Sequence, residues 1–186
     1  AASDNCNFTV MKKMLQSGHS VHIKNSDGLF PIHLVVKWSC LKYNFATRKP
    51  LTTDEILKAI NLLLTYKAKI NRKDRFGNTP LFYAVNSTNL KIFKYLLQKG
   101  AKINIRNKKG ATPLHWAISV GAIKKVTLLL AHGAKVMSKD NDGKNILFLL
   151  TKKFYKSKND LQIAKILISK GVNIHNTNSF NNSLLH

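Results

Sequence analysis

Apolar residues along the chain recur in pairs of short helical patterns. In the segments 76–85 and 109–118, a leucine (Leu81 or Leu114) and an alanine three positions later begin an apolar stripe. A second apolar pattern, IFKYLL in one case and KVTLLL in the other, follows each segment and ends at a glycine. The patterns predict paired short helices, with the small alanines allowing close contact between helices.

The paired patterns recur at a fixed interval. Gly77, Gly110 and Gly143 are spaced at 33 residues, which is typical of a repeat array. Two intervals are longer, by 16 residues before Gly77 and by 5 after Gly143. The extra residues fall at 38–53 and 152–160, each between two helical patterns, so we interpret them as loops inserted into an intact unit.

The residues around these glycines form a motif. It reads NTPLFYA at 78–84 and ATPLHWA at 111–117, and less regular versions occur at 29–35, 144–150 and 182–186. Over essentially its whole length the chain resembles the ankyrin-repeat family. The resemblance implies an all-α fold, an ankyrin-repeat solenoid of stacked helix-turn-helix units with β-hairpin-like fingers and about five repeats plus partial ends.

The alignment of repeats predicts a single array over residues 1–186. Its predicted parts are a partial repeat at 1–24, a repeat with the long insertion (38–53) at 25–73, two regular repeats at 74–106 and 107–139, a repeat with the short insertion (152–160) at 140–176, and the start of another repeat at 177–186. Neither end carries a polar capping repeat, which a free array normally needs. We therefore expect this chain to be a piece of a longer repeat protein.

The motif residues have structural roles. Thr-Pro predicts a helix start, because the hydroxyl can cap free N–H groups and Pro suits the first helical position. The resemblance implies that His33, His115 and His186 make turn hydrogen bonds and that Trp116 packs in the core. Lys67 replaces a helix-ending glycine, at a local cost of about 1 kcal/mol.

The formal net charge is +23, from 27 Lys and 4 Arg against 8 acidic residues. Such a field attracts acidic proteins, nucleic acids and anionic membranes. The scarcity of Arg disfavours a dedicated nucleic-acid reader, because bidentate contacts to bases and phosphates favour the guanidinium group. Abundant Lys, Asn and Ile also fit an AT-rich genome, so the charge is either a working surface or a bias of composition.

The sequence carries no recognisable catalytic pattern. No nucleotide-binding, zinc-protease or serine-hydrolase motif occurs, and His19 and His22 have no Cys or acid beside them to complete a metal site. We therefore expect no enzyme activity, no cofactor and no metal. No apolar run reaches the ~18 residues of a membrane helix. Cys6 and Cys40 form no CxxC pair, so we expect an intracellular protein, cytoplasmic or nuclear, or one delivered into a host cell.

The candidate binding residues follow from the resemblance, since ankyrin repeats usually bind partners on the concave face formed by finger tips and first helices. Four successive units end in a cation, and stacked helices would space this ladder at ~8–10 Å: Lys24, Lys73, Arg106 and Lys139. The finger tips add Arg75, Phe76, Lys108 and Lys109. Phe76 is either an anchor for a partner or packed against the neighbouring finger. A second column interacts favourably with helix C-termini: Lys69, Lys102 and Lys135.

These patterns lead to a functional hypothesis. We expect a non-catalytic protein–protein interaction module that binds an acidic protein partner through its concave groove and finger tips. The alternatives are an electrostatic binder of nucleic acid or anionic membrane, and a structural spacer within a larger effector or toxin-like protein. The first insertion ends in a capping box at 52–55. Its other residues either fold back onto the stack or present a docking site: Trp38, Tyr43, Phe45, Arg48 and Lys49.

Overall fold

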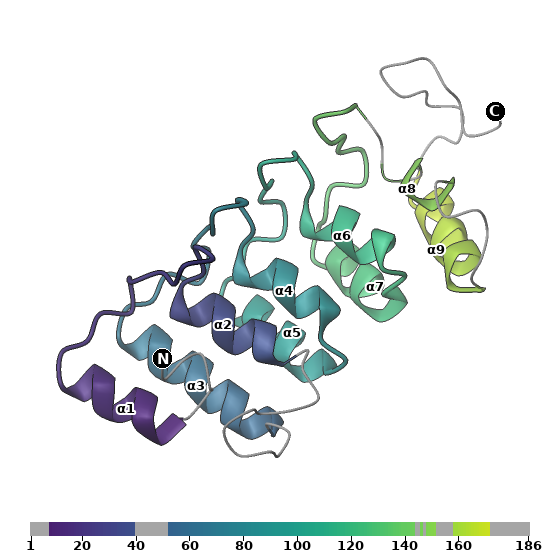
Figure 1. The fold of residues 1–186 in the computed structure, drawn as a ribbon. Helices are drawn as coiled ribbons and strands as arrows, with labels where there is room; N and C mark the ends of the chain where they lie inside the picture. Colours follow the sequence, from purple (N-terminus) through teal and green to yellow (C-terminus); the bar gives the residue numbers. More distant parts are fainter. Residues whose placement is uncertain (1–7, 40–51, 144–145, 147, 152–157, 172–186) are drawn as a thin grey trace. The chain divides into compact units, whose positions relative to one another are not determined.

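The computed structural model describes residues 8–39, 52–143, 146, 148–151 and 158–171 (Figure 1). The chain divides into two compact units, Ala1–Lys102 (unit 1) and Ile103–His186 (unit 2). Within the described residues the regular structure consists of α-helices joined by turns, so the all-α prediction is confirmed.

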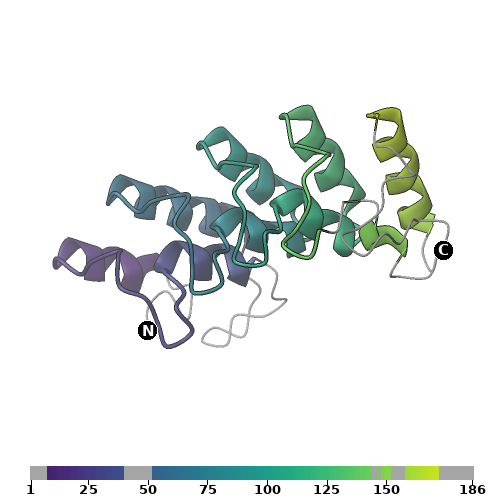
Figure 2. The same ribbon diagram turned by 90° about the horizontal axis from the view of Figure 1, so that it is seen from above.

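Unit 1 arranges its described helices in two layers. One layer holds α2 (Pro31–Trp38) and α4 (Pro80–Asn86), which pack side by side. The other layer holds α1 (Phe8–Gln16), α3 (Thr53–Thr65) and α5 (Leu90–Gln98), with α3 in contact with both of its neighbours. Because α2 also packs on α3 and α4 on α5, the paired helices of the sequence pattern are present. Figure 2 shows the turns before α2 and α4 on the same side of the unit.

Unit 2 repeats this pairing. Helix α6 (Pro113–Ser119) packs on α7 (Ile123–Ala131). A further pair follows, in which α8 (Phe148–Thr151) contacts α6 and α9 (Lys158–Ser169) contacts α7. Each unit therefore has the same two kinds of contact, namely between the two helices of a pair and between equivalent helices of successive pairs.

The apolar stripe of each repeat forms the core. Leu81 and Ala84 are fully buried in α4, and Leu114 and Ala117 are at most 1% exposed in α6. Burial of each large aliphatic side chain contributes about 1.5–3 kcal/mol, while the alanines let adjacent helices approach. Lys67 has a φ of 65° at the end of α3, so it does adopt the left-handed conformation that glycine holds at the ends of other repeats.

The helix starts follow the predicted signals. Helices α4 and α6 begin at Pro80 and Pro113. Helix α3 begins at Thr53, where Thr52 Oγ1 accepts from the Glu55 N–H at 3.2 Å and Glu55 Oε2 accepts from the Thr52 N–H at 2.8 Å. The predicted capping box is therefore confirmed.

One predicted helix cap is wrong. The Thr79 hydroxyl is buried without a hydrogen-bond partner, although it was expected to cap α4. Three residues later, Phe82 stands in the histidine position of the motif. In α6, by contrast, Thr112 Oγ1 lies 2.8 Å from His115 Nδ1, which also accepts from the Thr112 N–H at 3.1 Å. The imidazole supplies a partner that a phenyl ring cannot offer.

The fingers, which are the turns that link one helix pair to the next, contain no strand among the described residues. Their β-hairpin-like form, the number of repeats and the repeat boundaries therefore stay predictions. The predicted partial ends and both insertions fall largely outside the described residues: 1–7, 40–51, 152–157 and 172–186.

The two threonines give a matched test. Thr79→Val should stabilise the fold by about 1 kcal/mol, because it removes a buried hydroxyl that has no partner. Thr112→Val should destabilise it by about 1 kcal/mol, because it removes a hydroxyl that is hydrogen-bonded. Urea unfolding followed by circular dichroism measures both free energies. Equal destabilisation by the two substitutions would contradict the assignment.

Candidate functional site

An Asn or Asp side chain closes each finger turn. Asp74 Oδ1 accepts from the N–H groups of Phe76 and Asn78, both at 2.8 Å. In unit 2, Asn107 Oδ1 makes the equivalent two bonds, both at 3.0 Å. Gly77, with a φ of 79°, completes the first of these bends. Asp74 thus stabilises the finger bend through its own side chain.

A buried histidine positions the finger of unit 1 that carries most of its candidate residues. His33 Nε2 lies 2.9 Å from the carbonyl oxygen of Arg72 and 3.1 Å from that of Asn78. His33 Nδ1 accepts from the Phe30 N–H at 3.3 Å, so Nε2 carries the proton that is donated to the carbonyls. The finger between Arg72 and Asn78 is thereby tied to α2 at both of its ends.

His115 has the same role in unit 2. Its Nε2 donates to the carbonyl oxygen of Ser138 at 3.1 Å. Burial lowers the pKa of both His33 and His115 below the ordinary histidine value, against the opposing effect of the carbonyl hydrogen bonds. The predicted turn hydrogen bonds are confirmed for these two residues, and His186 lies outside the described residues.

Every candidate binding residue is exposed: Lys24, Lys73, Arg75, Phe76, Arg106, Lys108, Lys109 and Lys139. The predicted ladder of four cations is divided between the units. Lys24 and Lys73 belong to unit 1, and Arg106 and Lys139 belong to unit 2.

Arg75 and Phe76 form a stacked pair at the tip of a finger in unit 1. The Arg75 Cζ lies 4.7 Å from the centroid of the Phe76 ring, which is 51% exposed. An Arg75 terminal nitrogen lies 3.8 Å from Asp27 Oδ1 on the preceding finger. The arginine stem lies against Gly28, where a Cβ would be only 2.8 Å from the Arg75 Cβ. The guanidinium is thus held beside an accessible aromatic ring.

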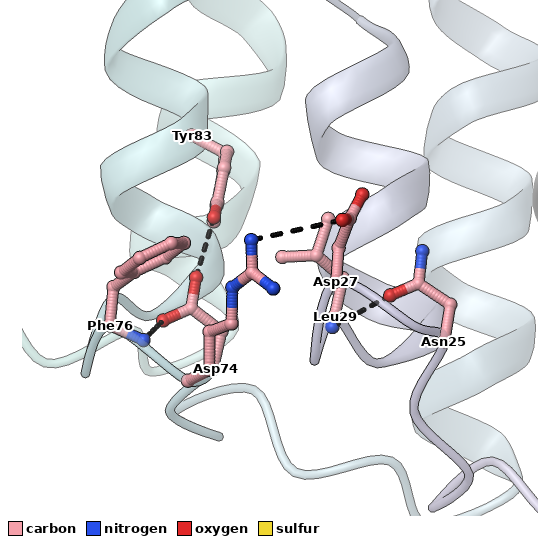
Figure 3. A network of polar contacts seen from close by, with 7 residues as sticks. Asn25, Asp27, Leu29, Asp74, Phe76 and Tyr83 are labelled. Atoms are coloured by element: carbon pink, nitrogen blue, oxygen red, sulfur yellow. Dashed lines mark hydrogen bonds and ion pairs between the residues drawn. The ribbon is translucent and has the colours of Figure 1, made fainter.

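Asp74, the acid next to this pair, accepts hydrogen bonds through both of its carboxylate oxygens. Asp74 is 7% exposed, and its Oδ2 accepts from the Tyr83 hydroxyl at 2.5 Å (Figure 3). Burial is the main cause that raises the pKa of Tyr83, with further contributions from its hydrogen bond to Asp74 and from that charge. The phenol stays protonated and donates, so Asp74 joins the finger to α4.

The equivalent surface in unit 2 has different partners. Arg106 Nη2 donates to Asn141 Oδ1 at 3.2 Å, and Asn141 Nδ2 donates to the Lys108 carbonyl oxygen at 2.8 Å. Asn141 lies over Gly110, much as Arg75 lies over Gly28. Arg106 therefore helps to join two fingers, while the Lys108 and Lys109 side chains remain exposed.

The second column of lysines is set by backbone contacts. Lys69, Lys102 and Lys135 are exposed after helix ends. Asn71 Oδ1 accepts from the Lys102 N–H at 2.8 Å, and Asn104 Oδ1 accepts from the Lys135 N–H at 3.0 Å. The backbone N–H groups of Lys102 and Lys135 thus join successive turns, independently of the lysine side chains.

The prediction that Trp116 is a core residue is wrong, because its side chain is 40% exposed. Successive helical residues are rotated by about 100°, so Trp116 lies about 200° from buried Leu114. Val120, four residues after Trp116 and 42% exposed, shares its face of the segment. The angle between Trp116 and Leu114 could have been read from the sequence, and it would have predicted that Trp116 is exposed. The Asp27–Arg75 contact could not, because the two residues are 48 positions apart.

A family model described as ankyrin repeats (3 copies) matches residues 53–140. Residues 53–140 therefore consist of ankyrin repeats. Ankyrin repeats are generally protein–protein interaction modules and are typically non-catalytic. No curated protein matches the chain.

Other parts of the chain that the structure describes add little chemistry. Among the described residues, no three His, Cys, Asp or Glu side chains are grouped as metal ligands, and no helix is long and apolar enough to cross a membrane. His19 Nδ1 lies 3.0 Å from the Met14 carbonyl oxygen. In the first insertion Trp38 is half-buried, and its other candidate residues lie outside the described part: Tyr43, Phe45, Arg48 and Lys49.

The buried histidines predict a loss of stability in acid. The folded-state pKa of His33 and His115 is lowered, so the unfolded ankyrin chain binds protons more tightly. Their contribution is complete above the unfolded value of about 6.5 and is lost as the pH falls toward the folded pKa, by at most about 1.4 kcal/mol per pH unit and group. Urea unfolding between pH 5 and 7.5 should show this slope, reduced in a His33→Gln, His115→Gln variant. An unchanged slope in the variant would contradict the assignment.

Proposed function

We propose that this ankyrin-repeat chain binds an acidic protein partner through the concave side of its fingers, with these residues in contact: Lys24, Lys73, Arg75, Phe76, Arg106, Lys108, Lys109 and Lys139. The family supports a protein as the partner. The fingers of each unit form a separate contact surface.

One observation carries the proposal, namely the half-exposed Phe76 ring with the Arg75 guanidinium stacked beside it. Arginine and aromatic residues are enriched in interface hot spots, because they combine a large apolar area with directional donors. The finger is held by His33 and Asp74, so little ordering of its backbone is needed on binding.

The local charge supports an acidic partner. Seven of the eight proposed contact residues are cations. In the fingers of unit 1 the acids are Asp27 and Asp74, and Asp74 is buried with both carboxylate oxygens hydrogen-bonded. The positive field on these fingers is therefore weakly compensated, which favours association with an acidic surface.

Binding can be measured by fluorescence anisotropy with a Glu-rich peptide and a matched Gln-rich peptide. The chain should bind only the Glu-rich peptide. Lys24→Ser with Lys73→Ser should weaken binding about fivefold or more, as loss of two exposed charge contacts would. Lys108→Ser with Lys109→Ser tests unit 2 while leaving the Arg106–Asn141 bond in place.

The matched control is Lys91→Ser with Lys94→Ser, which removes two exposed charges from α5. Binding by this control should change less than twofold. An equal loss in the control would show attraction by net charge alone. Tighter retention on duplex DNA or anionic vesicles than on the peptide, falling steeply between about 50 and 200 mM salt, would refute protein recognition.

A further inference from the structure

Three features meet at Arg75 in unit 1. Its stem lies on Gly28, its guanidinium stacks on the Phe76 ring, and a terminal nitrogen faces the Asp27 carboxylate at 3.8 Å. Arg75 and Asp27 come from successive fingers. The free chain itself thus places a carboxylate beside this guanidinium.

The contact with Asp27 is readily broken. The two side chains are 51% and 58% exposed, and their separation is near the limit for an ion pair. Asp74 cannot replace Asp27, because its oxygens accept from Phe76, Asn78 and Tyr83. Water therefore reaches the pair, and a carboxylate from another molecule can compete for the guanidinium.

The use of arginine here is selective. The chain has 4 Arg among 31 cationic residues. Two of these arginines lie in this finger, and each stacks on a phenylalanine ring. The Arg72 Cζ lies 4.4 Å from the Phe30 ring centroid, and the Arg75 Cζ lies 4.7 Å from that of Phe76. A planar guanidinium can stack on a ring and still bind a carboxylate through its edge, which an ammonium group does poorly. In the other fingers the position of Arg75 holds Ser26, Lys108 or Asn141.

We propose that Arg75 and Phe76 form a carboxylate-binding site, that Asp27 occupies it in the free chain, and that an Asp or Glu side chain of the acidic partner displaces Asp27. This inference rests on the proposed function and assigns one of its contacts. The displaced Asp27 carboxylate goes to water. Asp27 thereby weakens binding of every acidic ligand at this site, because it competes with the ligand for the guanidinium.

A purely structural ion pair between the fingers makes the opposite prediction. In that case removal of the Asp27 charge loosens the fingers, and binding stays equal or weakens. Removal of an occupant, in contrast, frees Arg75 and tightens binding. The sign of the change in affinity therefore separates the two roles.

The test uses the Glu-rich peptide and four chains: wild type, Asp27→Asn, Arg75→Gln and the double variant. Asp27→Asn should bind about three- to fivefold more tightly, and Arg75→Gln should bind more weakly than wild type. In the Arg75→Gln background, Asp27→Asn should have no effect. Asp142→Asn, at the same finger position in unit 2, is the matched control for loss of one negative charge and should leave affinity unchanged.

Unchanged or weaker binding by Asp27→Asn would overturn the site. An equal gain in Asp142→Asn, or a gain that persists without Arg75, would also overturn it, because the effect would then be one of net charge. Far tighter binding of a phosphoserine peptide would overturn the choice of carboxylate. If neither wild type nor Asp27→Asn binds the Glu-rich peptide, the proposed function fails as well. If wild type binds and loses affinity in Lys24→Ser with Lys73→Ser, while Asp27→Asn has no effect, only this site fails.

Discussion

The hydrogen bonds from His33 Nε2 to two carbonyl oxygens organise the surface of unit 1. They connect α2, which packs on α3 and α4, to both ends of the finger that carries Lys73, Arg75 and Phe76. The imidazole is buried, so it must stay neutral with its proton on Nε2, and the backbone provides the two acceptors that this state requires. A surface element made only of turns thereby acquires the rigidity of the core, which is what a preorganised binding site needs.

The motif also shows what happens where the histidine is absent. Phe82 fills the same volume in α4 as an apolar residue, but it leaves the Thr79 hydroxyl buried without a partner. The finger that precedes α4 is secured by His33 of α2 and by the bond between Tyr83 and Asp74. The finger with the most distinctive exposed chemistry is therefore stabilised by long-range contacts, and its geometry depends on the packing of α2 against α4.

Charge acts at two scales in this chain. The net charge of +23 sets a broad field that draws in anions of any kind, and it cannot discriminate among them. Discrimination requires short-range geometry, and the fingers provide it through stacked guanidinium groups and through acids at fixed positions. The Asp74 carboxylate is buried and hydrogen-bonded within the fold, whereas the Asp27 carboxylate is exposed to water. Of these two aspartates in neighbouring fingers, only Asp27 can compete with a ligand for the guanidinium of Arg75.

The sequence by itself determined what is local to one repeat: the helix starts at Pro80 and Pro113, the capping box at Thr52, the left-handed helix end at Lys67 and the exposed finger cations. These features follow from dihedral preferences and hydrogen bonds between residues a few positions apart, and the spacing of 33 located them. Only the tertiary structure decided that Asp27 meets Arg75. This contact depends on how successive fingers stack, and the 16-residue insertion hides from the sequence which finger residues face one another.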